Sequence, residues 1–186
     1  MTVLLILLGV VVVFVVVVAL QPSEFKVARS AEIAAPPETV FEQVNDLHRW
    51  EAWSPWMKLD PNAKCTYEGP PAGVGAVFAW SGNKNIGEGR MTITESRPSE
   101  LVKFRLDFVK PFAGTCSADF TFKPLGNDTA VTWSMEGTNN FIAKAMSLFM
   151  SCDKMVGEQF EKGLAQMKSI AEGAAEKSAV LSRGNN

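Results

Sequence analysis

Six runs between Ala63 and Met135 alternate apolar and polar side chains with a period of two, and this pattern constrains the fold more than any other feature. Successive side chains of a strand point to opposite faces of a sheet, so each run predicts a strand with one dry and one wet face. Turn residues such as Gly82 and Asn83 separate the runs. The sequence therefore predicts an antiparallel meander.

A further strand and two short helical segments precede the meander. Residues 25–33 alternate as a strand, and the prolines that follow open a helix over Glu38–Asn45. A second helical piece, Asp46–Trp53, stops at Pro55. The spacing of three tryptophans in this region favours partial burial in the core, and contact with a bilayer interface is the alternative. These tryptophans are Trp50, Trp53 and Trp56.

A long amphipathic helix is predicted to close the chain. Apolar residues from Phe149 to Ile170 recur every three or four positions, which gives the helix one apolar stripe. Asn139 or Asn140 is the expected cap at its start. Gly157 is expected to soften or break the helix near Asp153, which would leave a short helix before a longer one.

The order of these elements predicts the fold class. A strand, two short helices, six strands and a long helix indicate an α+β helix-grip fold, in which a curved seven-stranded antiparallel sheet wraps on the C-terminal helix. A single helix cannot fill a curved sheet of this size. We therefore expect an elongated apolar space between the sheet and the helix.

The side chains on the dry face are the candidate ligand-binding residues. Aromatic rings offer flat surfaces and methionine adapts to irregular shapes, so together they suit a variable hydrophobic ligand. An ordinary core position is the alternative for each of them. The strands supply Phe78, Trp80, Met91, Phe104, Phe108, Phe120, Trp133 and Met135, and the closing helix supplies Met150.

Arg29 is the one charged residue in phase with an apolar strand face. It is a candidate for binding an acidic ligand head group. The favoured alternative is that it lies near the strand start and extends its guanidinium to water, because a buried arginine is rarely left unpaired.

The search for catalytic chemistry is mostly negative. His48 is the single histidine, so a metal cluster built on several histidines is excluded. Its place in a Trp-rich helical turn favours a solvent-facing or locally hydrogen-bonded side chain over a catalytic one. The sequence contains no Gly-x-Ser-x-Gly elbow, no phosphate loop and no complete dinucleotide fingerprint. It therefore predicts no catalytic residue, no metal and no cofactor.

The first twenty residues carry no charged side chain and are almost all Val, Leu and Ile. A helix of this length reaches about 30 Å, enough to cross a bilayer. A cleaved signal peptide is the alternative, but no Lys or Arg precedes the run and the run is longer than a usual signal core. Lys26 and Arg29 follow the span, which favours a cytoplasmic domain.

The remaining length is typical of one domain. We predict an anchor at 1–20, a linker at 21–24, a domain at 25–172 and a flexible tail at 173–186, which is rich in Ala, Ser and Gly. The chain has 18 basic and 20 acidic residues, so it lacks the basic surface of a nucleic-acid binder. Three widely spaced cysteines form no disulfide framework.

The domain resembles the SRPBCC superfamily, also called START-like or Bet v 1-like, and particularly its polyketide cyclase/dehydrase and lipid-transport group. The resemblance covers about residues 25–171 and rests on the order of several short strings. These strings are Arg29, Ser30, Ile33, Ala35, Pro36, Val40 and Phe41; Trp50, Trp53, Ser54, Pro55 and Trp56; Gly73 to Ala76; Gly87 to Gly89; and Phe160, Gly163 and Leu164.

The resemblance implies binding of a lipid, sterol or polyketide, and only some members catalyse a reaction. We expect a membrane-anchored protein that binds a lipid or other hydrophobic small molecule in an apolar cavity, with transport as an extension of that role. A cyclase/dehydrase-like enzyme is one alternative, and it requires inward-facing polar residues. A protein-interaction module is the other. Fold alone does not decide among them.

Overall fold

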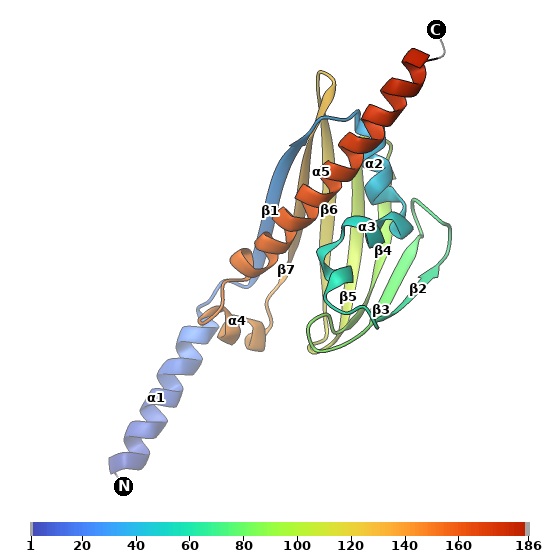
Figure 1. Cartoon of the computed structure of the whole chain (residues 1–186). Coiled ribbons are helices and arrows are strands. Elements are labelled where there is room, and N and C mark those ends of the chain that lie inside the picture. The colour runs from blue at the N-terminus through green and yellow to red at the C-terminus, as the bar shows by residue number, and fades with distance from the viewer. Residues whose placement is uncertain (1, 185–186) are drawn as a thin grey trace.

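The computed structural model of the chain describes residues 2–184 and shows one curved antiparallel sheet with helices packed on its inner face (Figure 1). The strands are β1 (Glu24–Ile33), β2 (Lys64–Glu68), β3 (Val77–Ser81), β4 (Glu88–Arg97), β5 (Leu101–Lys110), β6 (Gly114–Leu125) and β7 (Asp128–Thr138). The helices are α1 (Thr2–Ala19), α2 (Pro37–Asn45), α3 (Trp50–Trp53), α4 (Phe141–Ser147) and α5 (Cys152–Gly184), with 3-10 turns η1 (Leu47–Arg49) and η2 (Pro55–Lys58).

The sheet has seven strands in the order β1-β7-β6-β5-β4-β3-β2, and all neighbours are antiparallel. Strands β2 to β7 form the predicted meander. Strand β1, the first in the chain, pairs with β7 along the whole length of β1. Helix α5 lies diagonally across the inner face of the sheet, and α2 and α3 cover the part beside it (Figure 1). The predicted helix-grip fold is confirmed.

The predicted short helix before a longer one is present, and the interruption lies at residues 148–151, close to Asp153 but not at Gly157. A polar cap starts each of the two helices. The Asn140 side chain accepts a hydrogen bond from the Ala143 amide at 2.8 Å and starts α4, and Ser151 accepts one from the Lys154 amide at 3.2 Å and starts α5. Gly157 lies inside α5 instead, where the absence of a side chain leaves room for Arg29.

The segment for which the sequence predicts a flexible tail continues α5 as far as Gly184. Six of the eight residues at 174–181 are Ala, Glu, Lys or Leu, and these residue types favour a helix once one has begun. Residues 185 and 186 lie outside the described part of the chain.

Helix α1 projects away from the domain, and its C-terminal end is the end nearest the sheet (Figure 1). Its side chains are exposed except for Val18, which is fully buried close to α4. The helix is long and apolar enough to cross a membrane, although a signal sequence near the N-terminus can meet the same criterion.

Candidate ligand-binding site

The inner face of the sheet divides into two halves that differ in what covers them. The strand register places Ile93, Phe104 and Phe120 toward the end of the sheet that α2 and α3 cover. Toward the end where β1 begins and α1 enters, the same face is only partly covered. We call these parts the closed half and the open half. The buried residues of the closed half are Ile93, Phe104, Phe120 and Trp133, and the partly buried residues of the open half are Phe25, Phe78, Trp80, Leu106, Phe108 and Met135. Met135 lies where the halves meet, in the same cross-strand row as Phe104.

Tryptophan side chains from the short helices fill the closed half. The Trp133 ring stacks on Phe160 of α5 with centroids 4.0 Å apart, and on Phe120 at 4.7 Å. Trp50 meets Trp133 edge-on at 6.0 Å. The indole N–H groups do not remain unpaired, because Trp53 donates to the Gln43 carbonyl at 2.9 Å. Trp50 donates to the Val44 carbonyl at the same distance.

The expected elongated apolar space therefore does not extend through the closed half. The prediction counted one helix against the sheet, whereas the tryptophans after α2 supply the volume that one helix lacks. Trp50 and Trp53 are buried and Trp56 is partly buried against Trp133 and Phe160, which confirms core burial of these residues.

The open half is lined by partly buried aromatic and aliphatic side chains. The Trp80 ring lies 5.9 Å from the ring centroids of both Phe78 and Phe108. It lies close to Gly89, where an added Cβ would sit 2.6 Å from the indole. Its N–H donates to the Ile86 carbonyl at 3.0 Å, so the polar edge of the partly exposed indole is satisfied.

A pocket of about 490 Å³ adjoins the open half at the base of α1. Phe25 belongs to both the pocket and the open half. It lines the pocket, and it pairs with Gly137 in the same cross-strand row of the sheet as Leu106. The wall opposite Phe25 is the turn between α4 and α5. The pocket residues are Gln21, Pro22, Glu24, Phe25, Asn139, Ser147, Leu148, Phe149, Met150, Ser151 and Cys152.

Arg29 points from the inner face of β1 to α5, where two carboxylates hold it. Its guanidinium donates to Asp153 at 3.0 Å and to Glu161 at 2.7 Å. The hydrogen bond from Arg29 holds the pKa of the Asp153 carboxyl below its ordinary value. A Cβ at Gly157 would overlap the guanidinium, so glycine at this position makes room for the ion pairs. Arg29 thus joins the sheet to the start of α5.

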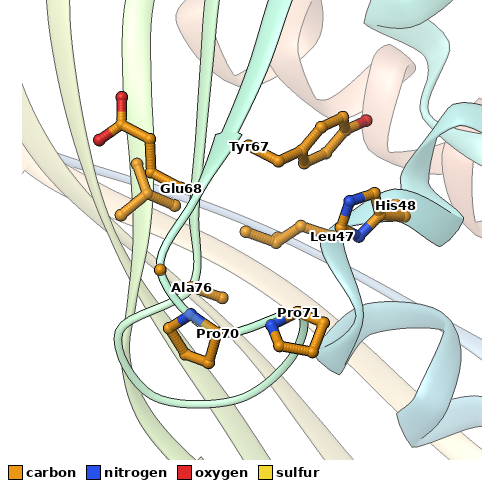
Figure 2. Close-up of a pocket in the computed structure, with 9 residues that line it drawn as sticks. Leu47, His48, Tyr67, Glu68, Pro70, Pro71 and Ala76 are labelled. Carbon is orange, nitrogen blue, oxygen red and sulfur yellow. The ribbon is translucent and has the colours of Figure 1, made fainter.

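A second, smaller pocket of about 210 Å³ lies between η1 and the loop after β2 (Figure 2). His48 stacks on Tyr67 with ring centroids 4.0 Å apart, and the Tyr67 hydroxyl donates to Glu51 at 2.8 Å. Burial, and then the hydrogen bond to Glu51, raise the pKa of the Tyr67 phenol. The Glu68 carboxylate points away from this pair (Figure 2).

The structure separates the predicted ligand-binding residues into three groups. Met91, Phe104, Phe120 and Trp133 are buried in the core. Phe78, Trp80, Phe108 and Met135 line the open half, and Met150 is an exposed wall residue of the larger pocket. Arg29 is engaged by Asp153 and Glu161.

Phe25 and Leu106 were not among the predicted site residues, although both are in phase with an apolar strand face. The missing information was the register, since alternation shows which face a side chain points to but not how far along the sheet it lies. Tyr67 was also missed, because its partners His48 and Glu51 approach it from the preceding helical segment.

Metal binding finds no support in the arrangement of side chains. Within residues 2–184, no group of three or more His, Cys, Asp and Glu residues is placed to hold an ion. The cysteines Cys65, Cys116 and Cys152 are free. Burial raises the pKa of the Cys116 thiol to about 11.

A family model described as polyketide cyclase / dehydrase and lipid transport matches residues 24–172. Comparison with curated protein sequences gives no significant match.

Solved structures share the fold at low sequence identity. An aromatase/cyclase from Streptomyces sp. R1128 has a TM-score of 0.59 and 16% identity, covering 80% of this chain and 94% of that one. A Chromobacterium violaceum protein has a TM-score of 0.57 and 18% identity, covering 82% and 99%. A Mycobacterium smegmatis protein has a TM-score of 0.55 and 19% identity, covering 80% and 92%.

Proposed function

Because this chain belongs to the polyketide cyclase/dehydrase and lipid-transport family, we propose that it binds a hydrophobic small molecule or lipid in the open half of its sheet. The proposal rests on one observation: the apolar inner face of the sheet is fully covered by other side chains in its closed half and only partly covered in its open half. Side chains such as Trp80, Phe108 and Met135 are as apolar as those of the core, yet no helix closes over them completely. An apolar ligand that covers them removes this surface from water.

We further propose that α1 anchors the domain to a membrane. Helix α1 exposes nearly all of its apolar side chains, which is favourable in lipid and unfavourable in water. Retention of the protein in membranes after alkaline extraction, with an intact mass that includes residues 1–20, is the expected result. A mass that lacks these residues would identify them as a cleaved signal peptide instead.

Ligand binding is tested by mass spectrometry of an organic extract from the full chain, purified from its native membranes in mild detergent. A mock purification from cells without the protein is the first control. We expect one hydrophobic compound, or a narrow class of them, to be enriched with the protein. A reproducibly empty protein would contradict ligand binding and favour the alternative of a protein-interaction module.

Two neighbouring residues on opposite faces of β5 locate the binding surface. Phe108 lines the open half, whereas Val109 is exposed on the outer face. Phe108→Ser should lower the amount of bound compound about tenfold, since burial of a Phe side chain contributes roughly 1.5–3 kcal/mol. Val109→Ser should leave it unchanged. Equal effects of the two substitutions would place the ligand elsewhere.

A cyclase-like enzyme is the second candidate, and the smaller pocket is the observation that favours it. Tyr67 and His48 supply the polar groups that acid–base chemistry requires, and the Tyr67 phenol is protonated at neutral pH, where it can donate a proton. If this pocket is catalytic, Tyr67→Phe should abolish conversion of the extracted compound without releasing it. Unchanged conversion by this variant would contradict the acid–base role.

A further inference from the structure

Exposed large apolar side chains gather where α4 meets α5. Phe149 is 80% exposed, and five neighbours within fifteen residues are at least 42% exposed. The six residues, which we call the turn surface, are Phe141, Ile142, Met146, Phe149, Met150 and Met155. Elsewhere in residues 25–172 the exposed large apolar side chains form no group larger than the pair Val109 and Phe112, and the others are the isolated Leu59, Val74 and Leu125. A concentration of this kind marks a contact surface.

The turn surface lies beside the end of α1. Helix α4 contacts α1, and Figure 1 shows α4 next to the C-terminal end of that helix. Residues 20–23 separate α1 from β1, so the first residue of β1 lies at most about 18 Å along the chain from the last residue of α1. A domain on so short a linker cannot move far from a bilayer that α1 crosses.

Hydrogen bonds hold this linker against α4 and the end of β7. The Asn139 amide donates to the Ser23 carbonyl at 2.8 Å, and the Asn139 side chain donates to the Pro22 carbonyl at 3.3 Å. Lys144 of α4 donates to the Ser23 hydroxyl at 2.8 Å. The turn surface is therefore kept at a fixed place beside the point where α1 leaves the domain.

We propose that the turn surface docks on the lipid bilayer that α1 enters. This inference rests on the membrane anchor of the proposed function. Apolar side chains of a short helix lower their free energy when they enter the boundary between head groups and acyl chains. Exposed Lys154 stands among them and suits the anionic surface of a membrane. The nearby Asp153 carboxylate is engaged by Arg29.

Docking gives the larger pocket an entrance at the membrane. Phe149 and Met150 belong to the turn surface and also line the pocket, so a docked turn surface places the mouth of the pocket at the lipid. A hydrophobic ligand then moves between the bilayer and the open half without crossing water. The turn surface would thus select ligands that partition into the membrane.

The test is photolabelling of the full chain in phosphatidylcholine liposomes, with a phospholipid that carries a diazirine in its upper acyl chain. Labelled peptides are identified by mass spectrometry. We expect α1 and the peptides that span residues 141–155 to be labelled several-fold more strongly than peptides that contain Val74 or Leu125. Phe149→Ser should reduce labelling of residues 141–155 and leave labelling of α1 unchanged. Val74→Ser, which alters an exposed apolar residue outside the turn surface, should change neither.

The possible results separate the two proposals. Labelling of α1 without labelling of residues 141–155 would overturn docking and leave the anchor in place. Absence of label from both would overturn the anchor and docking together. Crosslinks between residues 141–155 of two chains, in place of lipid adducts, would identify the turn surface as a dimer contact and overturn bilayer docking. Ligand extraction is a separate measurement, so none of these results depends on it.

Discussion

The closed and open halves of the inner face are built from the same strands and the same kinds of side chain. Trp133 in the closed half and Trp80 in the open half are both tryptophans on the dry face of a strand. Trp133 stacks on both Phe120 and Phe160 and is buried, whereas Trp80, among the aromatic rings of residues 2–184, contacts only Phe78 and Phe108 of its own sheet and stays partly exposed.

The difference lies in the elements above the sheet. The closed half receives Trp50 and Trp53 from one side and α5 from the other, and these together fill the curve. At the β1 edge of the open half, Phe25 lines a pocket together with the interruption between α4 and α5, where four residues replace a continuous helix. An apolar strand face therefore becomes core or candidate binding surface according to its cover, while its composition stays the same.

The largest expected effect comes from a matched pair of tryptophan truncations. Trp53 is 0% exposed, and Trp53→Ala should lower the free energy of unfolding by about 3–5 kcal/mol, because it leaves a cavity. Trp80→Ala should cost about 1–2 kcal/mol, since it removes one hydrogen bond and part of an already exposed surface. Urea unfolding followed by circular dichroism measures both.

The amount of bound compound distinguishes the two variants further. Trp80→Ala should lose bound compound in the extraction experiment while it remains folded. A loss of stability as large as that of Trp53→Ala would show that the two halves are equally packed, and the comparison would fail.

An intermediate effect is expected at Gly157, where α5 passes over Arg29 near the start of the helix. Replacement of glycine by alanine within a helix ordinarily stabilises it by about 1 kcal/mol. Gly157→Ala should give less than this or destabilise the protein, because the new Cβ displaces the guanidinium from Asp153 and Glu161.

The background Arg29→Met provides the control for Gly157. With the guanidinium gone, Gly157→Ala should recover the full stabilisation, and thermal unfolding of the four proteins in the cycle measures the coupling. The same gain with and without Arg29 would show that this contact does not hold α5 to the sheet.

The smallest effect concerns the pH dependence of the Arg29–Asp153 ion pair. The pKa of Asp153 is lowered in the folded protein, so the pair stabilises the fold above the ordinary carboxyl pKa, and this contribution is lost as the pH falls through the lowered value. Asp153→Asn should therefore lower the melting temperature slightly at pH 7, and the difference from the unaltered protein should shrink below about pH 3.

Glu158→Gln is the matched control for Asp153→Asn, since Glu158 is exposed on the same helix, one turn further along. It should change the melting temperature little at either pH. A deficit of Asp153→Asn that is the same at pH 7 and pH 3 would rule out the ion pair as its source.

Much of the fold could be predicted because its signals are local. Alternation placed Phe78, Met135 and their neighbours on the dry face, and the prolines after β1 placed the first helix to within one residue. The same reasoning did not anticipate the helix past Gly173, and it attributed the break in the closing helix to Gly157. Helix propensity continued α5 past Gly173, and polar caps rather than Gly157 set the interruption.

The amino-acid sequence by itself determined the strands, the face each side chain occupies and the apolar character of α1, because side-chain direction and helix length follow from local geometry. Only the tertiary structure decided that Phe104 is core and Phe108 is partly exposed, that Arg29 is paired, and that the turn surface lies beside α1. These outcomes depend on contacts such as Trp133 with Phe160 and Arg29 with Glu161. Such contacts join residues far apart in the chain, and no local pattern encodes them.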